Sequence, residues 1–171
     1  MKSVIKPVLL VAFSIVAVTG CVNPHKLESV KNGSKYSYDA FHQTQSFEAP
    51  YISGRGPQYQ LTAIADKDGW LMYELYILSN STYFADFDYA LDAEGSEFNV
   101  YHQDYYLACG SAGCRGLDWV KIRIMPWQIK KYSKTGLQLQ FNGSSKVLVD
   151  IPATYIVGFA QSVNDNLKVR K

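Results

Sequence analysis

Residues 137–151 read LQLQFNGSSKVLVDI, and this stretch decides the fold class. Apolar and polar side chains alternate from Leu137 to Phe141, which is the pattern of a strand buried on one face. Asn142-Gly143 favours a tight hairpin turn, and Lys146–Ile151 supplies a returning strand. The stretch therefore predicts an antiparallel hairpin that ends at Pro152, which cannot donate to a strand ladder.

The same pattern recurs upstream. Tyr59–Ile64 alternates, Asp66–Gly69 predicts a turn, and Trp70–Leu78 predicts a central strand because both of its faces carry large side chains. Further short strands are predicted at Phe47–Ile52, Asp86–Leu91, Phe98–Tyr101, Tyr105–Cys109 and Asp118–Met125. In the last of these, Val120, Ile122 and Ile124 share one face, while Lys121 and Arg123 are expected in water. The spacing predicts a mainly β protein, as a single antiparallel β-sandwich or a small barrel.

Two helices are expected beside the strands. Pro126 suits a first helical position and Gly136 a helix end, which predicts a short helix near residues 126–133. Ala153–Val163 places Tyr155, Ile156, Phe159 and Val163 near helical spacing, which predicts a C-terminal helix packed on the sheet. No second shift in composition follows residue 46, so residues 46–171 are expected to form one domain.

Composition excludes two classes of protein. Of the 171 residues 47% are apolar and 19% charged, which is too apolar for a disordered chain. A net charge of +2 lacks the strong positive field of a nucleic-acid-binding protein, so no nucleic-acid partner is expected. Aromatic residues make up 14% of the chain and include 13 tyrosines, which favours β-structure.

The first twenty residues have the three parts of an export signal. Lys2 and Lys6 give a positive start, Pro7–Val18 carries no charge, and small residues follow. The uncharged stretch is shorter than the ~20 apolar residues needed to span a bilayer. Residues 1–20 are therefore predicted to be a signal peptide. Its removal would leave 15 basic and 15 acidic side chains, so the basic excess belongs to export.

The end of this signal, Val18-Thr19-Gly20-Cys21, resembles the lipobox of bacterial lipoproteins. In that class the cysteine thiol receives a diacylglycerol, the leader is cut before the cysteine, and the new amino group is acylated, commonly with palmitate. The resemblance covers about the first 21 residues and implies lipidation at Cys21. It also implies a lipid-anchored protein of the bacterial cell envelope. Val22 stands where Asp favours retention in the inner membrane of enteric bacteria, which implies the outer membrane.

The stretch that follows the signal shows no clear period. Residues 21–45 contain Asn, Pro, Lys, Ser, Gly and His, with a turn signal at Asn32-Gly33-Ser34. A short helix over Leu27–Asn32 is compatible with this stretch. We interpret residues 21–45 as the lipidated N-terminus and a flexible tether to the β-rich periplasmic or surface domain.

Cys109 and Cys114 are the other two cysteines, separated by Gly-Ser-Ala-Gly. An exported chain enters an oxidising compartment, so a local disulfide is predicted. The alternative is a metal site with His102, but no paired Cys or His motif supplies the remaining ligand. No metal and no other cofactor is expected.

No catalytic residue is assigned. His25 and His42 lie in the predicted tether, and His102 could act as a base beside Asp104 but is more simply explained as a loop or edge histidine. Asp86 and Asp88 would share a strand face, and a pair of carboxylates could serve an envelope hydrolase. A solvated strand face explains them more simply.

The aromatic side chains are the remaining functional signal. Four of them are predicted as possible ligand contacts, namely Tyr101, Tyr105, Trp119 and Trp127, since exposed Tyr and Trp suit sugar rings and protein partners. The leading hypothesis is a non-catalytic β-domain with a structural or partner-binding role in the envelope. The alternative is a module that binds a glycan or a peptide through these Tyr- and Trp-rich strands.

Overall fold

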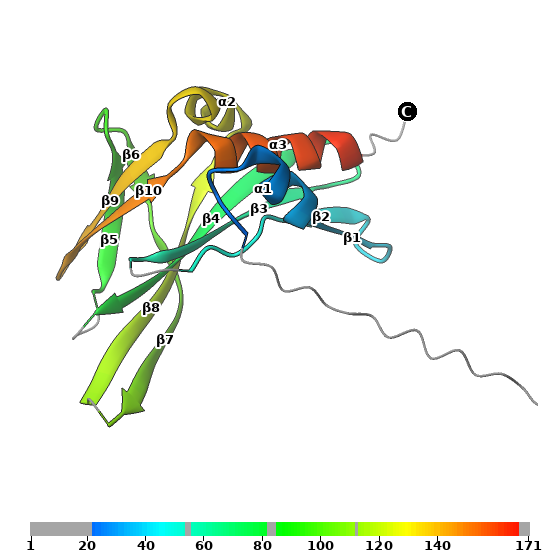
Figure 1. Cartoon of the computed structure of the whole chain (residues 1–171). Helices are drawn as coiled ribbons and strands as arrows, with labels where there is room; N and C mark the ends of the chain where they lie inside the picture. Colours follow the sequence, from blue (N-terminus) through cyan, green and yellow to red (C-terminus); the bar gives the residue numbers. More distant parts are fainter. Residues whose placement is uncertain (1–21, 54–55, 82–84, 112, 168–171) are drawn as a thin grey trace, which may run out of the picture.

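The computed structural model describes residues 22–53, 56–81, 85–111 and 113–167. Within these ranges the chain forms ten strands and three helices (Figure 1). The helices are α1 (Leu27–Gly33), α2 (Pro126–Thr135) and α3 (Ala153–Asn166). The strands are β1 (Lys35–Asp39), β2 (Thr44–Glu48), β3 (Gln58–Ala65), β4 (Leu71–Ser81), β5 (Phe87–Asp92), β6 (Glu97–Asn99), β7 (Tyr101–Gly110), β8 (Gly113–Ile124), β9 (Leu137–Gly143) and β10 (Lys146–Ile151).

The strands pair antiparallel in two sheets. The larger sheet has the order β1-β2-β3-β4-β8-β7 and the smaller one the order β10-β9-β5-β6. Neither order returns to its first strand, so both sheets are open rather than closed into a barrel. The mainly β antiparallel fold predicted from the sequence is confirmed, and β4 is a central strand as expected.

Both predicted helices are confirmed; α2 has its predicted ends, and α3 starts at the predicted Ala153 but continues past Val163 to Asn166. Pro126 opens α2, where its missing N–H is not needed, and the backbone N–H of Met125 donates to Oε1 of Gln128 at 2.8 Å. Gly136 ends the helix with a φ of 78°, and a Cβ there would lie 2.9 Å from the carbonyl oxygen of Ile151. This close approach in the left-handed region requires glycine.

One face of the six-stranded sheet builds the hydrophobic core. Alternate residues of β3, β4 and β8 are buried on this inner face, including Leu61, Leu75 and Ile122 at 0–1% exposure. Helix α3 covers it: Tyr155 and Phe159 meet β3 and β4 edge to face, at 5.3 Å from Tyr59 and 6.1 Å from Tyr73 respectively. Each such large side chain contributes about 1.5–3 kcal/mol through burial.

The two sheets meet along the start of β5. The carboxylate of Asp118 on β8 accepts a hydrogen bond from the backbone N–H of Ala85, just before β5. Ring nitrogen Nε2 of His102 on β7 lies 2.9 Å from the carbonyl oxygen of Phe87. A Cβ on Gly143 of β9 would lie 2.2 Å from the carbonyl oxygen of Asp86, so this junction admits only glycine.

Residues 22–45 correct the sequence analysis, because they are folded rather than a flexible tether. Helix α1 packs on α3: Val30 is fully buried, and a Cβ on Gly158 would lie 3.0 Å from Cβ of Val30. Strand β1 pairs with β2, which begins at Thr44 rather than at the predicted Phe47. The short helix expected over Leu27–Asn32 is present. A seven-residue helix is marginal alone, so its stability comes from the contact with α3, which the local sequence does not show.

Strands β7 and β8 form a long hairpin whose far end extends away from the helices (Figure 1). Residues 105–110 are exposed on both faces, and Leu107 retains 61% of its surface. The predicted disulfide between Cys109 and Cys114 joins opposite positions of the two strands near the tip, with a Cα–Cα distance of 4.0 Å. We call residues 105–117 the hairpin arm.

Candidate functional site

The outer face of the six-stranded sheet is the candidate site. It is the set of side chains opposite to the core on β3, β4, β8 and the first part of β7. The contacts of α3 described above fall on the inner face, and the outer side chains stay half-buried or exposed, apart from Glu74. Four aromatic side chains of these strands belong to this surface, namely Tyr76, Tyr101, Tyr106 and Trp119, and Tyr51, which precedes β3, joins it through a hydrogen bond to Gln58.

Strand pairing explains how this surface is assembled. Tyr76 on β4 stands opposite Lys121 on β8, and Lys121 stands opposite Tyr101 on β7. Residues directly opposite in antiparallel strands project to the same side, so the three side chains form one row. Trp119 precedes Lys121 by two residues on β8, so its side chain projects to the same face.

A buried carboxylate holds the charges of this face in place. Glu74 is 4% exposed and accepts hydrogen bonds from the Tyr76 hydroxyl at 2.9 Å and the Lys121 ammonium at 3.1 Å. Arg123 Nε lies 3.8 Å from the same carboxylate, and its guanidinium lies over the Tyr101 ring at 4.9 Å. Pairing satisfies the buried charge and orients Arg123 and Tyr101 together toward solvent.

The ionisation of this cluster follows from its partners. Burial raises the pKa of the Tyr76 hydroxyl, and its hydrogen bond to the Glu74 carboxylate raises it further. Burial alone would lower the pKa of Lys121, but the hydrogen bond to Glu74 and the nearby Tyr76 raise it overall. Lys121 therefore stays charged at neutral pH. Its half-buried, paired position corrects the expectation that Lys121 is free in water, whereas Arg123 is exposed as predicted.

The structure divides the four predicted ligand contacts. Tyr101 and Trp119 lie together on the outer face. Tyr105 belongs to the opposite face, because an extra residue near Gln103 shifts the register of β7, and its ring stacks on His102 at 5.2 Å. Trp127 lies on α2 rather than on these strands and is 66% exposed. The four side chains therefore do not line one pocket, and the sequence did not reveal Tyr76, Glu74 or Arg123 as their neighbours.

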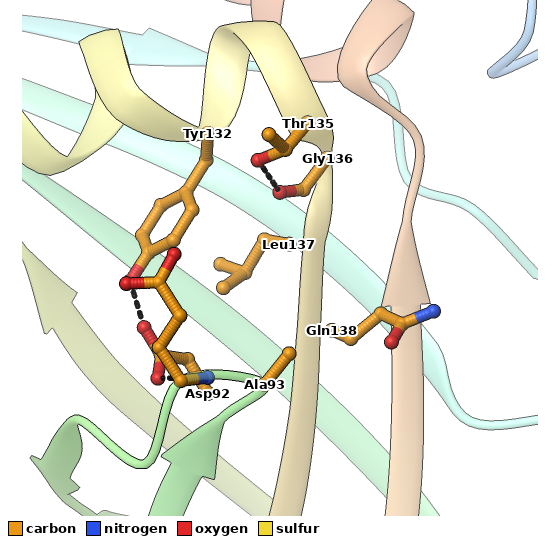
Figure 2. Close-up of a pocket in the computed structure, with 8 residues that line it drawn as sticks. Asp92, Ala93, Tyr132, Thr135, Gly136, Leu137 and Gln138 are labelled. Carbon is orange, nitrogen blue, oxygen red and sulfur yellow. Dashed lines mark hydrogen bonds between the residues drawn. The ribbon is translucent and has the colours of Figure 1, made fainter.

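A small pocket lies elsewhere, between the β5–β6 turn and α2 (Figure 2). Its volume is about 140 Å³, which is below the roughly 300 Å³ where ligand sites begin. The Asp92 carboxylate in its wall accepts hydrogen bonds from the Ser96 and Glu94 backbone and from the Tyr132 hydroxyl at 2.8 Å. These bonds, with Lys131 at 3.3 Å, hold the turn against α2 and hold the pKa of Asp92 at about 2 despite its burial.

The histidine and carboxylates considered for catalysis are not assembled. His102 uses Nε2 on a backbone carbonyl, and its other ring nitrogen has no hydrogen-bond partner among the described residues. His102 and Asp104 stand opposite Val120 and Trp119, on different faces of the sheet. Asp86 and Asp88 are both exposed, so the cleft that a hydrolase would require is not formed around them.

The described residues hold neither a metal-binding cluster nor a membrane-spanning helix. No group of three or more His, Cys, Asp or Glu side chains that could hold a metal ion is found in the part of the chain that the structure describes. In the same residues no helix has the length and apolarity needed to cross a membrane. Cys21 and the residues before it lie outside the described ranges.

Comparison with known proteins gives no relative from which a function could be transferred. The chain matches no protein-family model, and neither the curated proteins nor the solved structures contain a significant match to it.

Proposed function

We propose that this chain is a lipid-anchored protein of the bacterial envelope, most consistent with the outer membrane, whose β-domain binds a partner protein without catalysis. The observation that carries the binding role is the outer face. It presents Tyr, Trp and Arg side chains, which are the residue types enriched at the energetic centres of protein interfaces. The lipobox-like Val18-Thr19-Gly20-Cys21 supports the anchor.

The pairing around Glu74 supports this role because it fixes the arrangement of the outer-face side chains before a partner binds. Tyr101 and Arg123 contact one another before any partner arrives, and Arg123 also faces the Glu74 carboxylate. Side chains already fixed in their bound arrangement lose less conformational entropy on association. The outer face therefore combines the composition of an interface with preorganised side chains.

Two tyrosines of nearly equal exposure provide the test of the binding face. Tyr101 is 36% exposed on the outer face, and Tyr89 is 37% exposed on β5 of the other sheet. A photo-crosslinking amino acid would replace each in the full-length protein in intact cells. We expect a discrete adduct from position 101 that is lost with Arg123→Ala, and none from position 89. The same adducts from both positions would contradict the proposal.

The anchor is tested separately. Metabolic labelling with an alkyne analogue of palmitate should mark the protein, and Cys21→Ser should abolish the label. Equal labelling of the variant would contradict lipidation at Cys21 and leave the binding face to its own experiment.

A glycan is the second candidate for the same face. Tyr101 and Trp119 present partly exposed rings on the same face of neighbouring strands, and such rings stack on the apolar faces of sugars. Sedimentation of the full-length protein with purified cell-wall sacculi distinguishes this candidate. Binding that is lost with Trp119→Ala but kept with Trp127→Ala would favour the glycan, and no sedimentation would exclude cell-wall glycan as the ligand.

A further inference from the structure

The folded domain begins at the first residue after the proposed lipidation site. Val22 packs against the hydrophobic core, and its Cγ2 would lie 3.5 Å from a Cβ on Gly33. The next residues are held as well: the backbone N–H of Asn23 donates to Ser29 at 3.3 Å, and Lys26 donates to the carbonyl of Asn23 at 3.0 Å. The chain therefore enters the fold without a linker.

A contact with the C-terminal helix fixes this entry point from the other side. The Thr154 hydroxyl donates to the carbonyl oxygen of Pro24 at 2.9 Å, although the two residues are 130 positions apart. Lys31 forms an ion pair with Asp165 at 2.7 Å along the same α1–α3 contact. The N-terminal segment is thus attached to both ends of α3 rather than lying loose on the surface.

The length of chain between Cys21 and the folded domain limits how far the domain can lie from the membrane. A fully extended chain spans at most about 3.6 Å per residue, so one peptide unit joins the Cys21 backbone to Val22 within about 4 Å. A flexible tether over residues 21–45 would have allowed a reach of up to roughly 90 Å. The headgroup regions add only about 5–8 Å on each side of the hydrocarbon core, so a lipid on Cys21 holds Val22 at the headgroup layer.

We propose that the domain rests directly on the lipid surface through the residues around this entry point, with Asn23, His25 and Lys26 facing the headgroups. This inference rests on the proposed lipid anchor. All three side chains are exposed, and Lys26 suits the phosphates of anionic lipids. The hairpin arm extends away from α1 (Figure 1). A domain that contacts the lipid surface around Asn23 and Lys26 therefore keeps the arm away from that contact.

The test measures how close two positions lie to the bilayer. The full-length lipidated protein would be reconstituted in vesicles of phosphatidylethanolamine and phosphatidylglycerol, with a fluorophore on Lys26→Cys or, as the distant control, on Lys146→Cys. The native disulfide and the lipidated Cys21 leave the added thiol available for labelling. We expect a headgroup-attached quencher to quench position 26 several-fold more than position 146.

A matched variant gives the decisive comparison. A flexible Gly/Ser insert of about 20 residues between Cys21 and Val22 changes no folded residue and adds a mean reach of roughly 25 Å. It should remove most of the difference between the two positions while flotation with the vesicles is kept. Equal quenching at positions 26 and 146 without the insert would contradict direct contact of the domain with the lipid surface. An unchanged difference between the two positions with the insert would contradict it as well. Neither result would contradict the lipid anchor. Failure of the protein to float with vesicles would contradict the anchor, and with it the direct contact of the domain with the lipid surface.

Discussion

The two faces of the six-stranded sheet are built from the same strands but serve different purposes. On the inner face of β4, Leu75 and Ile77 are fully buried beneath the rest of the core. On the outer face, one residue away, Glu74 and Tyr76 organise a network of charges and rings. The strand therefore carries stability on its odd-numbered positions and surface chemistry on its even-numbered ones. Mutations on the two faces should therefore lower stability for different reasons, by loss of packing on the inner face and by loss of charge pairing on the outer one.

The largest contrast is expected between two leucines of β4. Leu75→Ala on the inner face removes a fully buried side chain, and we expect it to lower the free energy of unfolding by about 3–4 kcal/mol. Leu78→Ala on the outer face removes a half-buried side chain and should cost about 1 kcal/mol. Urea denaturation of the two variants measures this difference. Equal losses would show that the outer face is as much a core as the inner one.

A second variant tests whether the outer face has an energetic centre of its own. Glu74→Gln leaves Lys121 half-buried without its counter-charge, and we expect a loss of about 2–3 kcal/mol. Adding Lys121→Met should recover at least about 1 kcal/mol, because the orphaned ammonium is removed. If the double variant is as unstable as the sum of the single ones, the two side chains are not coupled.

Asp92 extends the comparison to a buried carboxylate of the smaller sheet. Its pKa is about 2 in the folded protein, below its ordinary value of 3.8. A lowered pKa means that the ionised carboxylate stabilises the fold above pH 4 and loses this contribution as the pH falls toward 2. Asp92→Asn should therefore be less stable by about 2 kcal/mol at pH 6, with a difference that shrinks below pH 4. A difference that is constant with pH would contradict a role for the charge.

The smallest effect is expected in the hairpin arm, where residues 105–110 are exposed on both faces and the contrast between the faces disappears. Replacing Cys109 and Cys114 with Ser should leave the melting temperature within about 3 °C, since the arm contributes little to the core. Faster amide hydrogen exchange is expected only within residues 105–117. Faster exchange throughout the sheet would mean that the disulfide stabilises the whole fold.

Local pattern was sufficient to predict the elements whose stability is visible in their own sequence. The β9–β10 hairpin, α2 with its Pro126 and Gly136 ends, and α3 all show a clear period or punctuation. Residues 22–45 were misinterpreted because β1 is exposed at every position and α1 depends on Gly158, far along the chain. Tyr36 and Tyr38 do alternate with polar residues in β1, but five residues are a weak strand signal, and a helix held by a distant contact leaves no local signal.

The candidate site was predictable only in part, for a related reason. Residue type alone singled out Tyr101 and Trp119. The side chains that orient Tyr101 are Arg123 on β8 and, through Arg123, Glu74 on β4. One irregularity in β7 moves Tyr105 to the opposite face, and no residue in that stretch signals it. Pairing register therefore decided which aromatic residues are neighbours, and register is a property of the assembled sheet.

The hydrogen bond between Thr154 and Pro24 has a consequence for the order of events in folding. A contact across 130 residues requires closure of nearly the whole chain, and it cannot form before α3 has been synthesised. The segment next to Cys21 thus gains this restraint only after every strand is available to pair. Until the last helix is complete the segment around Pro24 lacks this restraint, so the N-terminal end of the domain is among the last parts of the fold to be fixed.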